Sequence, residues 1–131
     1  IGLPEPRRGL IPFAGGVHRL PRQMPLKKAM GYLLTGRDMN ATEACELGLI
    51  NEVVPAKHLN ETVESWIADI LKCAPLAIRS IKQCVMEGLD YSLAEAMSHE
   101  YPWETRRQES EDSREGPRAF AEKREPRWTG Y

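Results

Sequence analysis

Apolar residues recur at helical spacing along much of the second half of the chain. From residue 59 onward they follow i, i+4, i+7 and i+8 steps, which place side chains on one face of a helix. The members of this stripe are Leu59, Val63, Trp66, Ile67, Ile70, Leu71 and Ala74. The pattern predicts a helix whose apolar stripe faces a core.

Further helices are expected after this stripe. Pro75 suits a first helical turn, Gly88 suits a helix end, and Ile78, Ile81 and Val85 would share the apolar face between them. These positions predict a helix over residues 75–88.

Two shorter helices are predicted nearer the C-terminus. Ser92 is expected to cap the first, which Pro102 must kink or end. Gly116-Pro117 is expected to start the last helix, which runs through Phe120 and closes at Pro126.

The first 25 residues have a different character. They hold five of the ten prolines and four of the ten glycines, so a shaped loop is predicted. A helix over residues 25–34 follows, with Gly36 as its stop. Residues 40–43, Asn-Ala-Thr-Glu, resemble a capping box that opens a short helix to Leu47. Residues 49–54 are the only convincing strand.

Composition narrows the class of protein. Apolar residues make up 41% and charged residues 28%, which is ordinary globular usage, and no apolar run has the ~20 residues that a membrane-spanning helix needs. No membrane partner is therefore expected.

Charge is unevenly distributed, although the net charge is only −1. Residues 1–40 carry seven Lys or Arg and two acidic residues, whereas residues 41–131 carry eleven and seventeen. The basic front part fits an anionic ligand or, equally, a solvated face. Nucleic acid is not expected, because the arginines are not interleaved with stackable aromatic residues.

Cysteine and histidine residues give no sign of a disulfide framework or a metal site. The chain has three cysteines, Cys45, Cys73 and Cys84, and none of them forms a CxxC pair. Because an odd number of cysteines is not typical of a disulfide framework, a reducing, cytoplasmic location is favoured. The three histidines are far apart and have no companion at ligand spacing, so no metal is expected.

Several spaced motifs match one known family. The segments PEPRRGLIPFAGGVHRLPRQ, LLTGRDMNATEACELGLINEVVP and EGPRAFAEKREPRW resemble the enoyl-CoA hydratase/isomerase family, also called the crotonase family. The likeness spans almost the whole chain. Within the family, AGGVHRLPRQM is most similar to a branch of carnitinyl-CoA dehydratase-like proteins. Because the chain begins with Ile1 on a Pro-rich segment, it is expected to be a C-terminal portion.

The resemblance implies a fold and an assembly. The fold would be an α/β crotonase-type spiral of ββα turns, of which this chain is the mainly α C-terminal part with one clear strand. Residues 1–55 would end the core and carry a catalytic loop, and residues 56–131 would form a helical oligomerisation region. The expected partners are the N-terminal portion of the same protein and further copies, in a homotrimer or a dimer of trimers.

The resemblance also implies a reaction. Family members bind an acyl-CoA thioester, polarise its carbonyl with two backbone N–H groups and stabilise the enolate. The implied activity is that of an acyl-CoA hydratase or dehydratase, with no cofactor besides the coenzyme A carried by the substrate. In the family the first catalytic glutamate and both oxyanion-hole segments precede this region, so the chain alone should be inactive. The alternatives are a non-catalytic helical assembly fragment and a family isomerase.

Glu5, in the pair Pro4-Glu5, matches the family's second catalytic glutamate, and Pro4 is expected beside the substrate. The apolar residues around it would give a general acid–base the surroundings it needs. The other interpretation is a solvated loop acid paired with Arg7 or Arg8.

Other substrate-binding candidates follow from the same resemblance. Gly15 and Gly16 match a loop beside the acyl group, or form a plain turn before a helix. Phe13 would narrow the acyl pocket, or pack in its loop. Phe120 and Lys123 match positions that touch the CoA nucleotide in some members, although an amphipathic helix explains them equally well.

Three arginines are expected to have structural roles rather than to bind substrate. Arg19, Arg22 and Arg37 are expected to bond loop carbonyls or carboxylates.

Overall fold

A computed structural model describes residues 1–131 and contains helices joined by turns and extended segments. The chain divides into two compact units, Ile1–Leu59 and Asn60–Tyr131, which are described separately below. The parts that the sequence suggested, residues 1–55 and 56–131, divide the chain at a similar place, and the roles given to them stay predictions.

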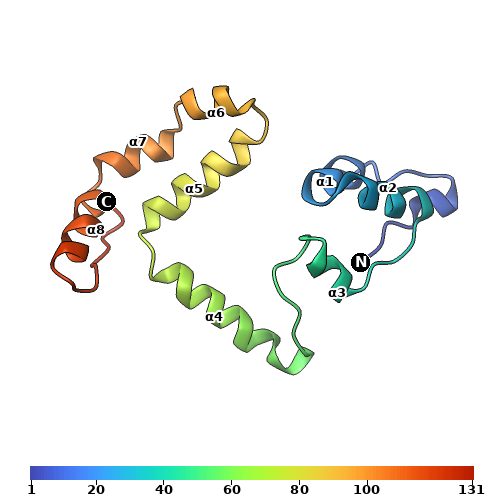
Figure 1. The fold of residues 1–131 in the computed structure, drawn as a ribbon, viewed down its shortest axis with the longest axis horizontal. Coiled ribbons are helices and arrows are strands. Elements are labelled where there is room, and N and C mark those ends of the chain that lie inside the picture. Colours follow the sequence, from blue (N-terminus) through green and yellow to red (C-terminus); the bar gives the residue numbers. More distant parts are fainter. The chain divides into compact units, whose positions relative to one another are not determined.

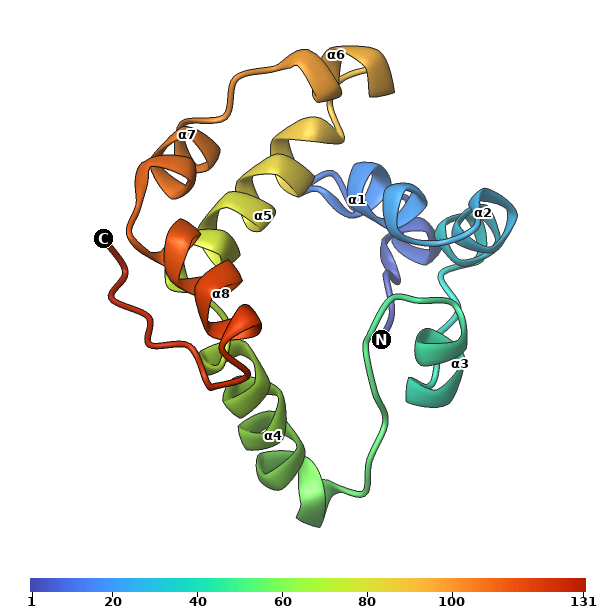
Figure 2. The same cartoon turned by 60° about the vertical axis from the view of Figure 1, so that its left-hand side comes forward.

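The first unit is built from short helical elements, shown in blue to green in Figure 1. They are the 3₁₀ helices η1 (Glu5–Arg8) and η2 (Ala56–His58) and the α-helices α1 (Gly16–Gln23), α2 (Leu26–Thr35) and α3 (Ala41–Glu46). Helix α2 packs against both α1 and η1, and α1 and α2 lie side by side in Figures 1 and 2.

The front segment is more helical than its composition predicts. Residues expected to form loop instead form η1 and α1, and α1 contains Pro21. Proline already has a helical φ, so within so short a helix it removes only one backbone hydrogen bond. Gly15, at φ 113°, turns the chain into α1, and Gly9, at φ 73°, ends η1.

The predicted end of α2 is confirmed, whereas only half of the capping box predicted for α3 is present. Helix α2 ends at Gly36, whose left-handed φ of 58° and N–H bond to the Tyr32 carbonyl close the last turn. The Asn40 side chain accepts a hydrogen bond of 2.9 Å from the Glu43 N–H and so caps α3. Met24, Ala29, Met39 and Ala44 form the buried core of this unit.

The strand predicted for residues 49–54 is not present in this structure. Residues 49–51 form bends and residues 52–55 have no regular structure. A strand requires a neighbouring strand to accept and donate its backbone hydrogen bonds, and the helical elements of this unit offer none. Leu49 and Ile50 pack instead against the core around Ala44.

The second unit consists of five α-helices. They are α4 (Leu59–Leu71), which begins at the last residue of the first unit, α5 (Pro75–Gly88), α6 (Leu93–Ser98), α7 (Pro102–Glu109) and α8 (Asp112–Ala121). The predicted helix over residues 75–88 is confirmed, as is the cap at Ser92, which forms a full capping box with Glu95. Helix α6 ends at Ser98, before Pro102, and Pro102 is the first residue of α7.

The central contact of the second unit lies between α5 and α7, which run side by side in Figure 1. The buried hydroxyl of Ser80 donates a hydrogen bond of 2.6 Å to Glu104, and the Gln83 side chain accepts one of 2.9 Å from the Trp103 N–H. These polar bonds and the buried Leu76 give α5 its inward face.

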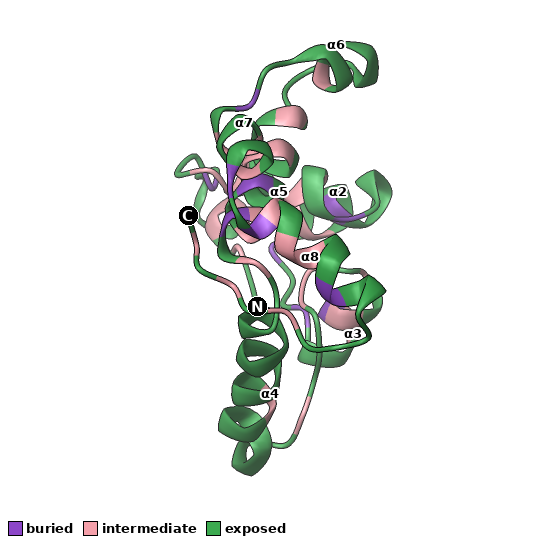
Figure 3. Ribbon diagram, turned by 90° about the vertical axis from the view of Figure 1, so that its left-hand side faces the viewer, coloured by how far each residue is buried: buried purple, intermediate pink, exposed green.

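Two predicted core faces are wrong for this structure. On α5, Ile78 is half-buried, but Ile81 and Val85 are 60% and 55% exposed, because Leu76 and Ser80 face the unit's interior instead. On α4, the stripe from Leu59 to Leu71 is exposed over its whole length, as the colouring of α4 in Figure 3 shows. Helical spacing places residues on one face but does not supply what covers that face.

The last helix begins earlier than expected. Helix α8 starts at Asp112, so Gly116 and Pro117 lie inside it. The Ser110 hydroxyl accepts a hydrogen bond of 3.2 Å from the Ser113 N–H and satisfies one of the free donors at this end. None of the helices combines the length and the apolar character needed to cross a membrane.

Candidate functional site

Glu5 occupies the first position of η1, immediately after Pro4. Pro4 and Pro6 hold the backbone in the turn, and the Leu10 N–H bonds to the Glu5 carbonyl oxygen at 3.0 Å. The side chain therefore projects from a short, closed turn with a defined backbone, which is the kind of support that a catalytic carboxylate needs.

The Glu5 carboxylate is partly enclosed and lacks a hydrogen-bond partner. Its Oε2 atom is shielded from solvent and accepts no hydrogen bond. The alternative pairing with Arg7 or Arg8 is not found, since the Arg7 guanidinium donates to the Thr35 carbonyl oxygen at 2.9 Å. Buried carboxylate oxygens normally have partners, so an unpaired one is typical of a group with a role outside the fold itself.

The apolar surroundings expected for Glu5 are only partly present. Leu3 is half-buried, whereas Ile1, Leu10 and Ile11 are each about 60% exposed. Within this unit these side chains form an open apolar margin beside the turn of η1.

The other front candidates have distinct surroundings. A side chain at Gly16 would meet Pro12 at 2.8 Å and Leu3 at 3.2 Å, so this glycine allows close packing of α1 on the front segment. Gly15 needs its φ of 113° for the turn, and Phe13 is 75% exposed. The substrate-binding roles of Phe13, Gly15 and Gly16 stay predictions.

Phe120 and Lys123 lie in the second unit, at the end of α8. Phe120 is 87% exposed, and Lys123 is the one non-glycine residue with a positive φ, 52°. The chain reverses at this point, and the Arg124 N–H bonds to the Ala119 carbonyl oxygen at 3.0 Å. Their contact with a nucleotide likewise stays a prediction.

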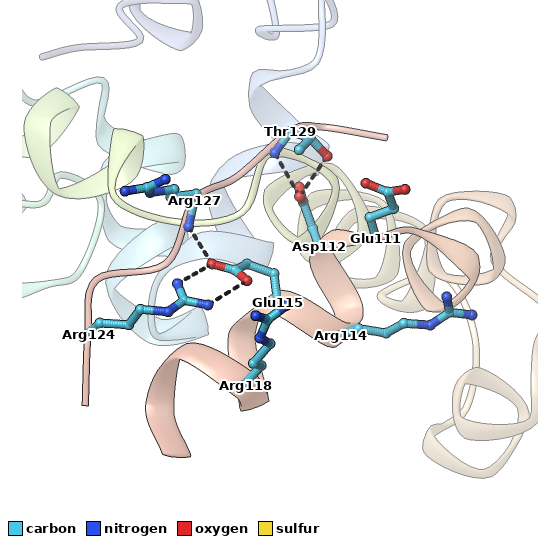
Figure 4. A pocket seen from close by; sticks show the side chains of 8 residues that line it. All are labelled: Glu111, Asp112, Arg114, Glu115, Arg118, Arg124, Arg127 and Thr129. Carbon is cyan, nitrogen blue, oxygen red and sulfur yellow. Dashed lines mark hydrogen bonds and ion pairs between the residues drawn. The ribbon is translucent and has the colours of Figure 1, made fainter. Parts of the chain in front are cut away.

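A charged hollow of about 600 Å³ lies between α8 and the C-terminal tail. Figure 4 shows Glu115 facing Arg124, whose guanidinium donates two hydrogen bonds to it, at 2.6 and 3.0 Å. The bonds from Arg124, together with one from the Arg127 N–H, lower the pKa of Glu115 to about 2. This cluster was not singled out from the sequence, which shows only a run of mixed charge.

Asp112 completes the attachment of the tail in the same hollow. Its carboxylate accepts from the Thr129 N–H and hydroxyl at 2.7 and 3.0 Å, and from the Gly130 N–H at 2.9 Å. Burial raises the pKa of Asp112, but these bonds outweigh it and leave the pKa below its ordinary value. The carboxylates of the hollow thus hold the protein's own backbone, which assigns them to structure.

The arginines divide into bound and unbound groups. Arg22 donates to the His18 carbonyl oxygen at 2.8 Å, as a structural arginine would, and Arg19 lies against Gly15. The guanidinium of Arg37, by contrast, makes no ion pair or hydrogen bond within residues 1–131. No group of three or more His, Cys, Asp or Glu side chains in these residues is placed to hold a metal ion.

Known proteins resemble the chain throughout its length. Carnitinyl-CoA dehydratase from Citrobacter koseri is 40% identical over 138 residues, covering 99% of this chain and 51% of that protein. An enoyl-CoA isomerase/hydratase from Mycosarcoma maydis is 37% identical, covering 99% of this chain and 47% of that protein. The chain spans about half the length of the curated relatives it matches.

Solved structures agree with these relatives. A putative enoyl-CoA hydratase/isomerase from Mycobacterium abscessus superposes with a TM-score of 0.90 at 40% identity, covering 100% of this chain and 54% of that one. A putative short chain enoyl-CoA hydratase from Novosphingobium aromaticivorans gives 0.91 at 38% identity, with coverage of 99% and 52%. The absence of a strand here is therefore compatible with a crotonase-type fold.

The sequence profile of one family, described as enoyl-CoA hydratase/isomerase, matches residues 1–131. The resemblance of the front motifs to carnitinyl-CoA dehydratases is also confirmed by relatives at about 40% identity. The chain belongs to the enoyl-CoA hydratase/isomerase family.

Proposed function

We propose that this chain is the catalytic-loop and helical part of an acyl-CoA hydratase or dehydratase, and that Glu5 is one of its two proton-transferring acids. The observation that carries the proposal is the shielded Glu5 Oε2 atom, which has no partner within the chain. Relatives with carnitinyl-CoA dehydratase activity in their names support the acyl-CoA substrate class.

The proposed reaction adds water across the double bond of an enoyl thioester, or removes it. In the forward direction the water oxygen bonds to the β-carbon, and the electron pair of the double bond moves onto the thioester as an enolate. A protonated Glu5 then gives its proton to the α-carbon, and the second acid accepts the proton released by the attacking water. In dehydration the Glu5 carboxylate removes the α-proton, the second acid gives its proton to the β-hydroxyl, and the C–O bond breaks so that the hydroxyl leaves as water.

The remaining parts of this site would come from a preceding portion of the same protein. The proposal needs two backbone N–H donors for the enolate oxygen and a second acid, which the family places before this region. A chain about half the length of its relatives supports this division. The open apolar margin of Ile1, Leu10 and Ile11 would then be covered on completion of the site.

The first experiment uses the 131-residue chain itself with crotonyl-CoA. Without the enolate donors and the second acid, we expect no hydration above the background rate, measured as loss of enoyl absorbance. Measurable turnover would contradict the division of the site proposed here.

The second experiment tests Glu5 in the chain joined to its preceding portion. Glu5→Gln keeps the shape but removes the transferable proton, so kcat should fall by roughly 10²- to 10⁴-fold with little change in KM. Glu46→Gln, at an exposed glutamate of α3, is the control and should keep full activity. A Glu5→Gln enzyme with kcat within twofold of the unaltered enzyme would rule out the role of Glu5.

A second candidate function, assembly into a trimer or a dimer of trimers, is favoured by the exposed stripe of α4. Side chains such as Val63, Ile67 and Ile70 are 41–49% exposed, and contiguous exposed apolar faces of this kind mark association sites. We expect mass measurement in solution to give a multiple of three, and Ile67→Glu to reduce it. A strictly monomeric protein would exclude this function.

A further inference from the structure

A second hollow lies within the first unit, along one face of α2. It has a volume of about 270 Å³ and is lined from Lys27 and Lys28, at the start of the helix, to Thr35 at its end. Arg37, just beyond the C-cap, and Glu43, in α3, complete the lining. Its size suits a small ligand and is too small for a folded partner.

The cations of this hollow outnumber its acidic groups. Lys27, Lys28 and Arg37 are exposed, and their side chains form no ion pair or hydrogen bond within residues 1–131. The one carboxylate of the lining, Glu43, lies near the Tyr32 hydroxyl and raises the pKa of Tyr32. With three cations and one acid, the lining has a net charge of about +2.

The start of α2 adds to this imbalance. Cations are normally disfavoured in a first turn, where the helix dipole is positive, yet this turn holds two lysines and no acid. Pro25 provides no side-chain cap there. An anion bound beside Lys27 and Lys28 would remove this unfavourable arrangement.

The other charged hollow provides the contrast. In Figure 4 the carboxylates of Asp112 and Glu115 are bound by Thr129 and Arg124, while the side chain of Arg114 points away from them. In that hollow the protein's own groups bind Asp112 and Glu115, whereas the cations along α2 have no such bonds.

We propose that the hollow along α2 binds a small, multiply charged phosphate anion of the diphosphate class. The Arg37 guanidinium can donate two parallel hydrogen bonds to phosphate oxygens, and the two lysines supply point charges at the other end of the lining. The Thr35 hydroxyl, which bonds to the Gly31 carbonyl oxygen at 2.6 Å and accepts from the Arg37 N–H at 3.3 Å, holds the backbone that carries Arg37. This site is separate from Glu5 and does not depend on the proposed function.

The test is equilibrium dialysis of the chain against radiolabelled inorganic diphosphate in metal-free buffer at physiological salt. We expect saturable binding at one site, weakened by added salt because exposed charges are screened. Arg37→Gln should weaken it by roughly tenfold, the effect of losing one charge-assisted bidentate contact. Lys57→Gln in η2 and Arg114→Gln in the other hollow are controls and should bind as the unaltered chain does.

Amide chemical shifts of the unaltered chain show where the anion binds, so the result does not depend on any one variant. The amides of Lys28, Gly31 and Arg37 should move on addition of diphosphate, and those around Arg114 and Arg118 should not. Saturable binding that is lost in the Lys27→Gln/Lys28→Gln/Arg37→Gln variant supports the site. Absence of binding, or equal binding by that variant, overturns it.

Competition with coenzyme A and with pantetheine distinguishes two possible sources of the phosphate group. Coenzyme A carries a diphosphate, whereas pantetheine carries none. If coenzyme A displaces diphosphate and binds at least tenfold more tightly, the nucleotide end of a thioester is the ligand. If it binds no better, the ligand is a free phosphate compound. Displacement by pantetheine would contradict phosphate recognition.

Discussion

The buried hydroxyl of Ser80 in α5 donates a hydrogen bond of 2.6 Å to the carboxylate of Glu104 in α7. The same carboxylate receives hydrogen bonds from Arg107 and Gln108, so one glutamate joins two helices through several donors. The ring of Trp103, next to Glu104, contacts the guanidinium groups of Arg79 and Arg106, which lie 5.1 and 5.3 Å from its centroid. Much of the α5–α7 contact is therefore polar.

Ser80→Ala should weaken the second unit. The change removes one donor to the half-buried carboxylate of Glu104, and we expect a loss of about 1–2 kcal/mol in the free energy of unfolding. Urea unfolding followed by helix circular dichroism measures it. Ser98→Ala, at an exposed serine whose hydroxyl bonds only within α6, is the control and should change stability little. Equal losses in the two variants would contradict this account.

Acid should weaken the same contact. Hydrogen bonds from Arg107 and Ser80 lower the pKa of Glu104 to about 2, from an ordinary value of 4.5. Because the folded pKa is depressed, the stabilisation is fully present above pH 4.5 and is lost as the pH falls towards 2. The stability difference between the unaltered chain and Glu104→Gln should therefore shrink across this range. A difference that stays constant would rule out the assigned ionisation.

Asp112→Asn should release the C-terminal tail. One amide oxygen cannot replace a carboxylate that accepts from Thr129 and Gly130 together. We expect hydrogen exchange at the Thr129 and Gly130 amides to accelerate by roughly tenfold or more. Asp90→Asn, at an exposed aspartate after α5, is the control. Unchanged exchange at both amides would contradict the role of Asp112.

Two glycines, Gly31 inside α2 and Gly36 at its C-cap, should respond to substitution by alanine in opposite directions. Gly36 has a φ of 58°, and an added side chain would meet Arg7 at 3.3 Å, so Gly36→Ala should cost about 1–2 kcal/mol of stability. Gly31 lies inside α2 with open space around it, so Gly31→Ala should add about 0.5–1 kcal/mol. Urea unfolding of the first unit, followed by amide signals, would show effects of opposite sign. The same sign for both would contradict the two conformations.

Much of the local structure could be predicted from the sequence, because its signals act over a few residues. A side chain at Asn40 or Ser92 reaches an N–H three positions away, and Gly36 adopts its φ without help from distant residues. The family likewise follows from spaced motifs that lie within the chain, and residues 1–131 match its profile.

What the sequence could not decide concerns contacts between distant residues. Ser80 and Glu104 lie 24 positions apart, and Asp112 and Thr129 lie 17 apart, so no periodicity links them. The same limit explains the α4 stripe, which spacing predicts as a face but which remains exposed. The sequence by itself determined the extent of α5, the end of α2, the caps at Asn40 and Ser92, and the family. Only the tertiary structure decided which faces are buried, that Glu5 Oε2 is unpaired and that Arg37 is unbound, because burial and pairing depend on groups brought together through space.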